Sequence, residues 1–232
     1  MIKAIIFDLD HTLFDRYATF RKIFEECDLS LWPFCDGVTR EQALEALIYT
    51  DRHYIHNLKP WHAVFEQLVK QGILRDDVIS IDDFYKVCIA PTYKQVAVPY
   101  DFAIPTLDTL RQMGFKLGLI TNGQHELQYA KLNKVGLADK FDEIIVSGDV
   151  GAQKPSTIPY EIMAERLGLD PSEMLYVGDN PQNDVDASRK AGYTPVWVRT
   201  TGTWIFPEIE KPELQVETVA EIPDIIRKIN NI

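Results

Sequence analysis

Cysteine is scarce in this chain, and the few cysteines follow no metal-binding or disulfide pattern. Among 232 residues there are three, Cys27, Cys35 and Cys88, an odd number with no C-x-x-C pair and no cysteine–histidine spacing typical of zinc sites. We expect them to pack as small apolar side chains in a reducing compartment. The sequence therefore argues against a disulfide scaffold and predicts a cytoplasmic protein.

Long hydrophobic runs are also missing. No stretch approaches the roughly 20 apolar residues that a membrane-spanning helix needs. The apolar start of the chain is short, and Asp8 and Asp10 interrupt it, which is not the pattern of a signal peptide. We therefore expect no membrane partner.

Positive charge is in short supply. Lysine and arginine number 24 against 35 aspartates and glutamates, which gives a formal net charge of −11 at pH 7. Such a chain is not expected to bind nucleic acid polymers or anionic membranes. It can still bind a phosphate group wherever a few cations and backbone amides converge. The remaining composition, 46% hydrophobic and 25% charged, is that of an ordinary globular protein.

Short apolar segments alternate with helical patterns along most of the chain. Near-continuous apolar runs of this kind are typical of a parallel sheet that is covered on both faces. The helical patterns between them include residues 159–167, which end at Gly168, and a closing amphipathic stretch over 222–229. We predict an α/β fold, a Rossmann-like parallel sheet flanked by helices. Its predicted strands are Lys3–Phe7, Phe115–Ile120, Glu143–Ser147, Met174–Val177 and Pro195–Val198.

The long interval after the first predicted strand contains helices only. Thr39-Arg40-Glu41-Gln42 has the form of a capping box that opens a helix. Apolar stripes at helical spacing follow, including one that begins at Trp61 and stops at Gly72. Residues 15–100 are therefore predicted to be an all-helical insert.

Chemically distinctive residues follow four of the predicted strands. Ligands of an open α/β sheet bind beyond the carboxyl ends of its strands, so these positions are informative. Each motif alone could be a turn or a helix cap. All four at strand ends, in this order, are hard to explain as turns. They are F-D-L-D-H-T-L at 7–13, T-N-G at 121–123, K-P at 154–155 and G-D-N-P-Q-N-D at 178–184.

Two of these aspartates, Asp8 and Asp10, come directly after a buried strand. An unpaired buried carboxylate costs several kcal/mol or changes its protonation state. A bound cation, a proton to transfer or a helix cap could each offset that cost.

The combined motifs resemble those of the haloacid dehalogenase-like (HAD) hydrolase superfamily. The resemblance covers essentially the whole chain, and the insert resembles the helical cap of subfamily I. The T-N-G motif and this cap look most like the branch that contains phosphoglycolate phosphatases and pyrimidine 5′-nucleotidases. The resemblance implies a Rossmann-like hydrolase core at 1–14 and 101–232 and a helical cap domain at 15–100.

The resemblance also implies a role for each acidic residue. Asp8 would be the nucleophile that forms an aspartyl phosphate. Asp10 would protonate the leaving alcohol and later deprotonate the attacking water. The implied cofactor is Mg²⁺, held by Asp8, by the backbone carbonyl of Asp10 and by Asp179, with Asp184 orienting this set or a bound water.

The same resemblance implies a phosphate-binding set. The Thr121 hydroxyl and the Asn122 backbone amide would hold phosphoryl oxygens, and Lys154 would supply positive charge to the developing anion. Thr12 is interpreted as structural, with a hydrogen bond to the backbone in the turn after the strand.

Asp10 also helps to choose between reactions. Dehalogenases of the superfamily lack an acid at this position, so the predicted function is a Mg²⁺-dependent phosphomonoester hydrolase acting on a small phosphorylated metabolite, a nucleoside monophosphate being slightly favoured. The alternatives left open are a phosphomutase on a sugar phosphate and a non-catalytic, phosphate-sensing member of the same fold. A monomer and a homodimer are both compatible with the sequence.

The chain departs from the common family pattern in two places. His11 stands where glycine or asparagine is frequent, and the proline after Lys154-Pro155 comes later than in the usual K-P-x-P. His11, Arg16, Tyr17 and His56 are the candidate substrate contacts. For each of them a structural or solvated position is the competing interpretation.

Overall fold

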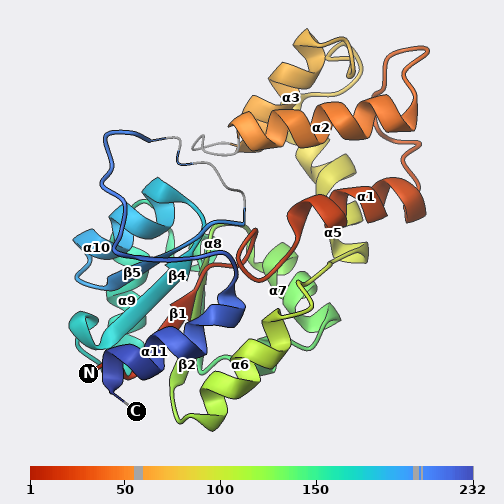
Figure 1. Ribbon diagram of the computed structural model, residues 1–232. Coiled ribbons are helices and arrows are strands. Elements are labelled where there is room, and N and C mark those ends of the chain that lie inside the picture. The colour runs from red at the N-terminus through yellow and green to blue at the C-terminus, as the bar shows by residue number, and fades with distance from the viewer. Residues whose placement is uncertain (55–59, 201–203, 205, 232) are drawn as a thin grey trace. The chain divides into compact units, whose positions relative to one another are not determined.

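The computed structural model describes residues 1–54, 60–200, 204 and 206–231. The chain divides into two compact units (Figure 1). Residues Met1–Asp15 and Pro99–Ile232 form the first, which we call the sheet unit, and Arg16–Val98 form the second, which we call the helical unit. His56 lies outside the described residues.

The sheet unit contains a six-stranded parallel sheet with the strand order β3-β2-β1-β4-β5-β6. The predicted α/β class and the five predicted strands are confirmed. The sixth strand was not predicted, because three residues with one buried side chain leave no apolar run to recognise. The strands are β1 (Ala4–Phe7), β2 (Lys116–Thr121), β3 (Glu143–Val146), β4 (Met174–Gly178), β5 (Thr194–Val198) and β6 (Leu214–Val216).

Strand β1 lies at the centre of the sheet, between β2 and β4. Phe7 is level with Leu119 on one neighbour and Val177 on the other. Since all strands run in the same direction, their carboxyl ends meet at one edge. The chain builds outward from β1 to β2 and β3, and then from β4 to β5 and β6. A ligand crevice is expected where the direction of building changes, beyond the ends of β1 and β4.

Helices cover both faces of this sheet (Figure 1). α6 (Ala103–Gln112) and α11 (Ile222–Asn230) lie together on one face, and α9 (Ile158–Leu167) and α10 (Ala187–Lys190) lie on the other. α9 ends at Gly168, which has a left-handed φ of 64°, as its sequence predicted. The remaining elements of this unit are α7 (His125–Lys134), η2 (Ala138–Lys140), α8 (Ser147–Val150), η3 (Pro171–Glu173), η4 (Pro181–Asp186) and η5 (Val219–Glu221).

The helical unit contains helices and no strand among its described residues. The capping box is present: the Thr39 amide donates to Gln42 Oε1 at 3.0 Å, and the Gln42 amide donates to Thr39 Oγ1 at 3.2 Å. Aromatic rings fill much of this unit, with edge contacts that join Phe20 to Trp61 and Tyr93. Its helices are α1 (Arg16–Glu26), α2 (Arg40–Tyr54), α3 (Pro60–Lys70), α4 (Ile81–Asp83), η1 (Phe84–Ile89) and α5 (Ala90–Gln95).

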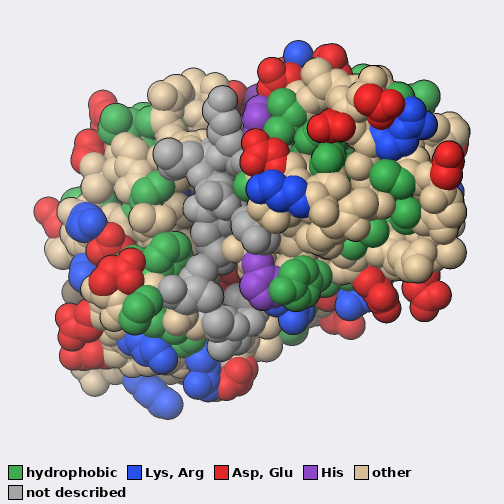
Figure 2. Space-filling model, turned by 90° about the horizontal axis from the view of Figure 1, so that it is seen from above, with side chains coloured by type: hydrophobic (Ala, Val, Ile, Leu, Met, Phe, Trp, Pro, Cys, Tyr) green, Lys and Arg blue, Asp and Glu red, His purple; other side chains and the backbone are tan. Residues whose placement is uncertain are grey.

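Charge is mixed on the surface. The face drawn in Figure 2 carries acidic side chains spread among lysines and arginines. Cys27, Cys35 and Cys88 are free thiols, and the first and last of them are buried. In the part of the chain that the structure describes, no helix has the length and apolar character needed to cross a membrane.

Candidate active site

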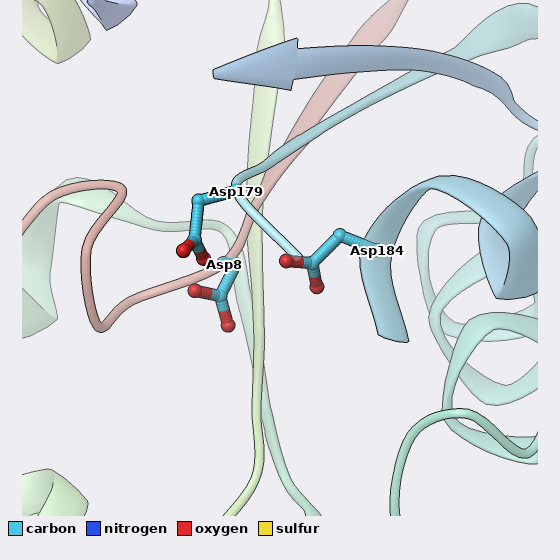
Figure 3. A group of neighbouring side chains, drawn as sticks. All are labelled: Asp8, Asp179 and Asp184. Carbon is cyan, nitrogen blue, oxygen red and sulfur yellow. The ribbon is translucent and has the colours of Figure 1, made fainter. Parts of the chain in front are cut away.

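Three carboxylates meet at the carboxyl edge of the sheet. Asp8 follows β1, Asp179 follows β4, and Asp184 lies on η4 (Figure 3). Their side chains are directed toward one another, and one oxygen from each lies within 4.8 Å of the others. All three residues are buried. The parallel register explains the meeting, because it brings the ends of β1 and β4 side by side.

Lys154 lies among these carboxylates. Its Nζ donates to Asp8 Oδ1 at 2.6 Å and to Asp184 Oδ1 at 2.7 Å. It also donates to the Tyr176 hydroxyl at 3.0 Å. The ammonium group is therefore placed against the predicted nucleophile and fixed from two further directions, in a position where positive charge acts through a poorly solvated interior.

Burial changes the acidity of these groups. Loss of solvation raises the pKa of Asp8 to about 7, against a smaller opposing effect of Lys154, and the neighbouring Asp184 raises it further. The pKa of Asp179 is also raised, by burial first and then by Asp184 and Asp8. Burial alone would lower the pKa of Lys154, but the carboxylates of Asp184 and Asp8 outweigh it and raise that pKa. Lys154 therefore stays charged.

This set of donors fits a divalent cation. Among the described residues, the ammonium group of Lys154 pairs with two of the three clustered carboxylates, Asp8 and Asp184. One positive charge does not neutralise three ionised carboxylates. Burial raises the pKa values of Asp8 and Asp179, and repulsion from the neighbouring carboxylates adds to this effect. Carboxylate oxygens at this spacing are the hard ligands that Mg²⁺ prefers.

The raised pKa of Asp8 predicts how the stability of the metal-free protein depends on pH. The folded-state pKa of Asp8 lies near 7, above its unfolded value of 3.8. The contribution of Asp8 to stability is therefore fully present below pH 3.8 and is lost as the pH rises through about 7. The asparagine amide in Asp8→Asn cannot titrate, so the unfolding free energy of this variant in EDTA should increase relative to wild type between pH 4 and pH 8. Urea unfolding across this range measures it, and a difference independent of pH would contradict it.

Asp184 approaches the backbone of the G-D-N motif very closely. A Cβ atom on Gly178 would lie 2.4 Å from Asp184 Cγ. The Asp184 carboxylate also accepts from the Asn180 amide at 2.8 Å. The Asn180 side chain in turn caps η4 by accepting from the Gln182 and Asn183 amides. The close packing of Asp184 thus explains the glycine at position 178. Asn180 is explained by its role as the N-cap of η4, one of the interpretations that the sequence left open for this motif.

Gly178→Ala is expected to displace Asp184 and to destabilise the protein by about 1–3 kcal/mol, the usual range for overpacking. Gly118→Ala is the matched control, because its Cβ would meet Ile6 and Met163 in the core at 2.7–2.8 Å, away from the carboxylates. Thermal unfolding with and without Mg²⁺ measures both. We expect Gly178→Ala to reduce the stabilisation by Mg²⁺ and Gly118→Ala to retain it; an equal response in the two variants would contradict this account.

The T-N motif is tied to the lysine loop. Asn122 Nδ2 donates to the Lys154 carbonyl, and the Lys154 amide donates to Asn122 Oδ1, both at 2.9 Å. The Asn122 side chain therefore holds the backbone of the residue that contacts Asp8. The Lys154–Pro155 bond is cis, and the later proline of this loop, Pro159, falls in the first turn of α9.

Thr121 is supported by a residue that the sequence did not reveal. Gln128, buried on α7, donates through Nε2 to Thr121 Oγ1 at 2.8 Å and to the Asn122 carbonyl at 2.7 Å. A hydroxyl oxygen that accepts in this way keeps its own proton available for another acceptor. The arrangement is compatible with the predicted role of Thr121 in holding a phosphoryl oxygen.

The loop after β1 presents a second acidic group. Lys131 Nζ donates to both carboxylate oxygens of Asp10 at 2.8 Å. The Thr12 hydroxyl was expected to bond the backbone of the turn; it instead donates to Asp8 Oδ2 at 3.3 Å, so Thr12 contacts the predicted nucleophile. His11 is buried and has a φ of 65°. Glycine and asparagine tolerate this left-handed conformation best, which gives a physical reason for their frequency at the position.

Two of the candidate substrate contacts lie in the helical unit. Arg16 is buried and forms a bidentate ion pair with Asp51. Arg16 Nε donates to Asp51 Oδ2 at 3.1 Å, and Arg16 Nη2 donates to Asp51 Oδ1 at 2.8 Å. Its guanidinium also lies 5.1 Å from the Trp61 ring. Tyr17 is partly buried, which raises the pKa of its hydroxyl to about 12. The structure thus gives Arg16 a place within the packing of its own unit, while its role and that of Tyr17 toward a substrate stay predictions.

Sequence reasoning missed three polar residues next to the site: Tyr176, Gln128 and Lys131. Tyr176 is a hydroxyl-bearing residue inside an otherwise apolar strand, M-L-Y-V-G. Gln128 and Lys131 are three positions apart and interrupt the buried face that α7 forms with Leu127 and Leu132. A polar residue within an apolar stripe was the available signal in each case.

Comparison with known proteins identifies the family of the chain. Residues 5–198 match the family described as haloacid dehalogenase-like hydrolase. The chain is 31% identical to a glyceraldehyde 3-phosphate phosphatase of Methanopyrus kandleri over 99% of both chains. It is 38% identical to a phosphoserine phosphatase of Thermus thermophilus over 86% of this chain and 80% of that protein.

A solved structure shares the fold of this chain. Two further relatives, at lower identity than those above, are named for other reactions. A HAD-hydrolase of Bacillus subtilis bound to magnesium has a TM-score of 0.74 at 23% identity, over 100% of this chain and 99% of that one. A pyrimidine 5′-nucleotidase of Escherichia coli is 28% identical over 84% of both chains. An (S)-2-haloacid dehalogenase of a Pseudomonas species is 26% identical over 97% of this chain and 94% of that protein.

Proposed function

The chain belongs to the haloacid dehalogenase-like hydrolase family, and from that premise we propose that it is a Mg²⁺-dependent phosphomonoesterase that acts on a small phosphorylated metabolite through an aspartyl-phosphate intermediate. One observation carries the proposal: a buried carboxylate, Asp8, is held by Lys154 beside two further carboxylates. Asp10 follows two residues later. Phosphatases among the relatives support the same reaction class.

The two units receive different roles in this proposal. Residues 1–14 and 101–232 are the hydrolase core, and residues 15–100 are a cap domain that contributes to substrate choice. Asp8, Asp179 and the backbone carbonyl of Asp10 would hold the metal, and Asp184 would orient these ligands. Bound there, Mg²⁺ supplies the positive charge that offsets repulsion between the carboxylate of Asp8 and the phosphate.

Residence in the cytoplasm, which the free cysteines suggest, stays a prediction.

In the first half-reaction an Asp8 oxygen attacks phosphorus. A bond forms between that oxygen and phosphorus, and the bond from phosphorus to the ester oxygen breaks. Asp10 in its protonated form gives its proton to the departing alkoxide, help that is typically worth about 10²–10⁴-fold. Lys154, the Thr121 hydroxyl and the Asn122 amide stabilise the negative charge on the other phosphoryl oxygens.

In the second half-reaction water hydrolyses the aspartyl phosphate. Asp10, now a carboxylate, takes a proton from the attacking water. The bond from phosphorus to Asp8 breaks, inorganic phosphate leaves and the Asp8 carboxylate is regenerated. In each turnover Asp10 gives one proton to the leaving alkoxide and takes one proton from water. It therefore returns to its protonated form.

The presence of Asp10 favours ester hydrolysis over dehalogenation, although a dehalogenase is among the relatives. A halide leaves without a proton, whereas an alkoxide needs one. For the substrate we favour a nucleoside monophosphate or another small phosphate monoester. The relatives named for glyceraldehyde 3-phosphate and phosphoserine extend the range to be tested to three-carbon phosphates.

The direct test is inorganic phosphate release from nucleoside monophosphates, sugar phosphates and three-carbon phosphates, with Mg²⁺ and with EDTA. We expect release from a narrow subset that depends on Mg²⁺. No release from any of them would overturn the proposal. Adding a sugar bisphosphate to the inactive mixtures would then reveal a phosphomutase, and failure there as well would leave the non-catalytic alternative.

A further inference from the structure

Lys131 is a buried cation that the proposed reaction does not use. It lies on α7, and the residue is 3% exposed. Its Nζ donates to Asp10 Oδ1 and Oδ2, both at 2.8 Å. The two residues are 121 positions apart in the chain, so the pairing is a product of the fold.

The geometry restrains Asp10. A carboxylate that accepts at both oxygens from one ammonium group cannot turn freely about its Cβ–Cγ bond without losing one of these bonds. Each oxygen still keeps a lone pair for a further proton or hydrogen bond. Short charge-assisted bonds of this kind are among the stronger contacts that a side chain makes. Lys131 thus fixes where both oxygens of Asp10 lie.

Packing alone does not explain a lysine at position 131. Burial of an ammonium group is unfavourable unless an anion and hydrogen bonds offset it. A leucine or methionine would fill the same place on α7 without that cost. Gln128, one turn earlier on the same buried face, likewise contacts a predicted site residue, Thr121. This face of α7 is therefore polar where it meets the site loops.

We propose that Lys131 is a positioning residue that holds the Asp10 carboxyl group in place for its two proton transfers. The inference rests on the function proposed above. It assigns Lys131 no contact with the substrate: Lys131 acts through Asp10, and its loss affects those steps in which a proton moves to the leaving group or from water.

If Lys131 positions Asp10, its loss should change the dependence of the rate on the leaving group, which a general loss of folded protein would not do. Proton donation matters for an ester whose alkoxide is a poor leaving group and matters little for an ester whose leaving group is already stable as an anion. Displacing Asp10 should therefore slow the hydrolysis of benzyl phosphate much more than the phosphorylation of the enzyme by p-nitrophenyl phosphate. General loss of folded protein would slow both equally.

The experiment compares kcat/KM for these two esters in wild type, Lys131→Met and Lys131→Gln, in the full chain with Mg²⁺. In Lys131→Met we expect the benzyl-to-nitrophenyl ratio of kcat/KM to fall by about 10-fold or more, within the range that acid–base help covers. Lys131→Gln keeps a neutral hydrogen-bond donor, so its benzyl-to-nitrophenyl ratio should lie between those of wild type and Lys131→Met. If the ring esters are poor substrates, two active phosphomonoesters with the most different leaving groups replace them.

Lys134→Met is the matched control, because Lys134 is exposed on the same helix; its ratio should equal that of wild type. Stopped-flow traces with p-nitrophenyl phosphate give a second measure, since slow hydrolysis of the aspartyl phosphate in Lys131→Met should produce a burst of nitrophenol. An unchanged ratio without a burst, in folded Lys131→Met or Lys131→Gln, would overturn the role of Lys131. A wild type that hydrolyses no ester would instead overturn the proposed function.

Discussion

Asp8→Asn is expected to lower phosphate release by at least about 10⁴-fold, the scale on which removing a nucleophile acts. The asparagine amide occupies the same space but cannot form the bond to phosphorus. The fold should survive, because the substitution removes one negative charge from a buried cluster of three carboxylates. Steady-state phosphate release at saturating substrate and Mg²⁺ measures the loss.

Asp10→Asn gives the informative contrast. With p-nitrophenyl phosphate its first half-reaction needs no proton donor, whereas its second half-reaction lacks a base. Mass spectrometry of acid-quenched samples should therefore show a phosphoryl group accumulating on Asp10→Asn and none on Asp8→Asn. Turnover by Asp8→Asn within 10-fold of wild type would remove Asp8 from the nucleophile position. Phosphorylation at a residue other than Asp8 would do the same.

Five of the six strands could be predicted from sequence because each of them is a short apolar run, and chemically distinctive residues follow four of these runs. The end of β1 shows this: Ala4 to Phe7 are fully buried and Asp8 comes next. Parallel pairing with β4 then brings Asp179 to the same edge. The proximity of Asp8 and Asp179 follows from two patterns in the sequence and one rule of sheet geometry.

The supports of the site could not be predicted in the same way. Lys131 and Gln128 act on residues in other loops, and their contacts depend on the rotation of α7 about its axis. Sequence periodicity predicts the broad apolar face of a helix, but it does not predict which group of a distant loop a given side chain reaches. Strand β6 was missed for a different reason, since its three residues make backbone hydrogen bonds to β5 but hardly contribute to the core.

Arg16 illustrates the limit for charged residues. Its position just after the first motif suggested a contact with an anionic substrate. The structure pairs it with Asp51, 35 positions further along, and surrounds it with aromatic rings. No local pattern reveals such a distant partner. His11 is the opposite case, because its positive φ is a local property. The family preference for glycine or asparagine at this position was a signal for it that the sequence analysis did not use.

Lys154→Met is expected to destabilise the metal-free protein by roughly 3–5 kcal/mol at pH 7, the range found when one partner of a buried ion pair is removed. Methionine fills much of the same volume, so the loss comes from charge: Asp8 and Asp184 each lose a short hydrogen bond to the ammonium group. Phosphate release should fall as well, since Lys154 supports the predicted attack by Asp8. Urea unfolding in EDTA measures the first effect.

The pH dependence distinguishes this cause from a packing defect. Lys154 lowers the pKa of Asp8, so its removal raises that folded-state pKa further above the unfolded value of 3.8. A group with a raised folded-state pKa contributes stability that is lost as the pH rises. The deficit of Lys154→Met relative to wild type should therefore be larger at pH 8 than at pH 5, and Mg²⁺ should reduce it at pH 8. A deficit that is equal at both pH values and insensitive to Mg²⁺ would show that Lys154 stabilises the fold by packing, and that the carboxylate cluster does not need its charge.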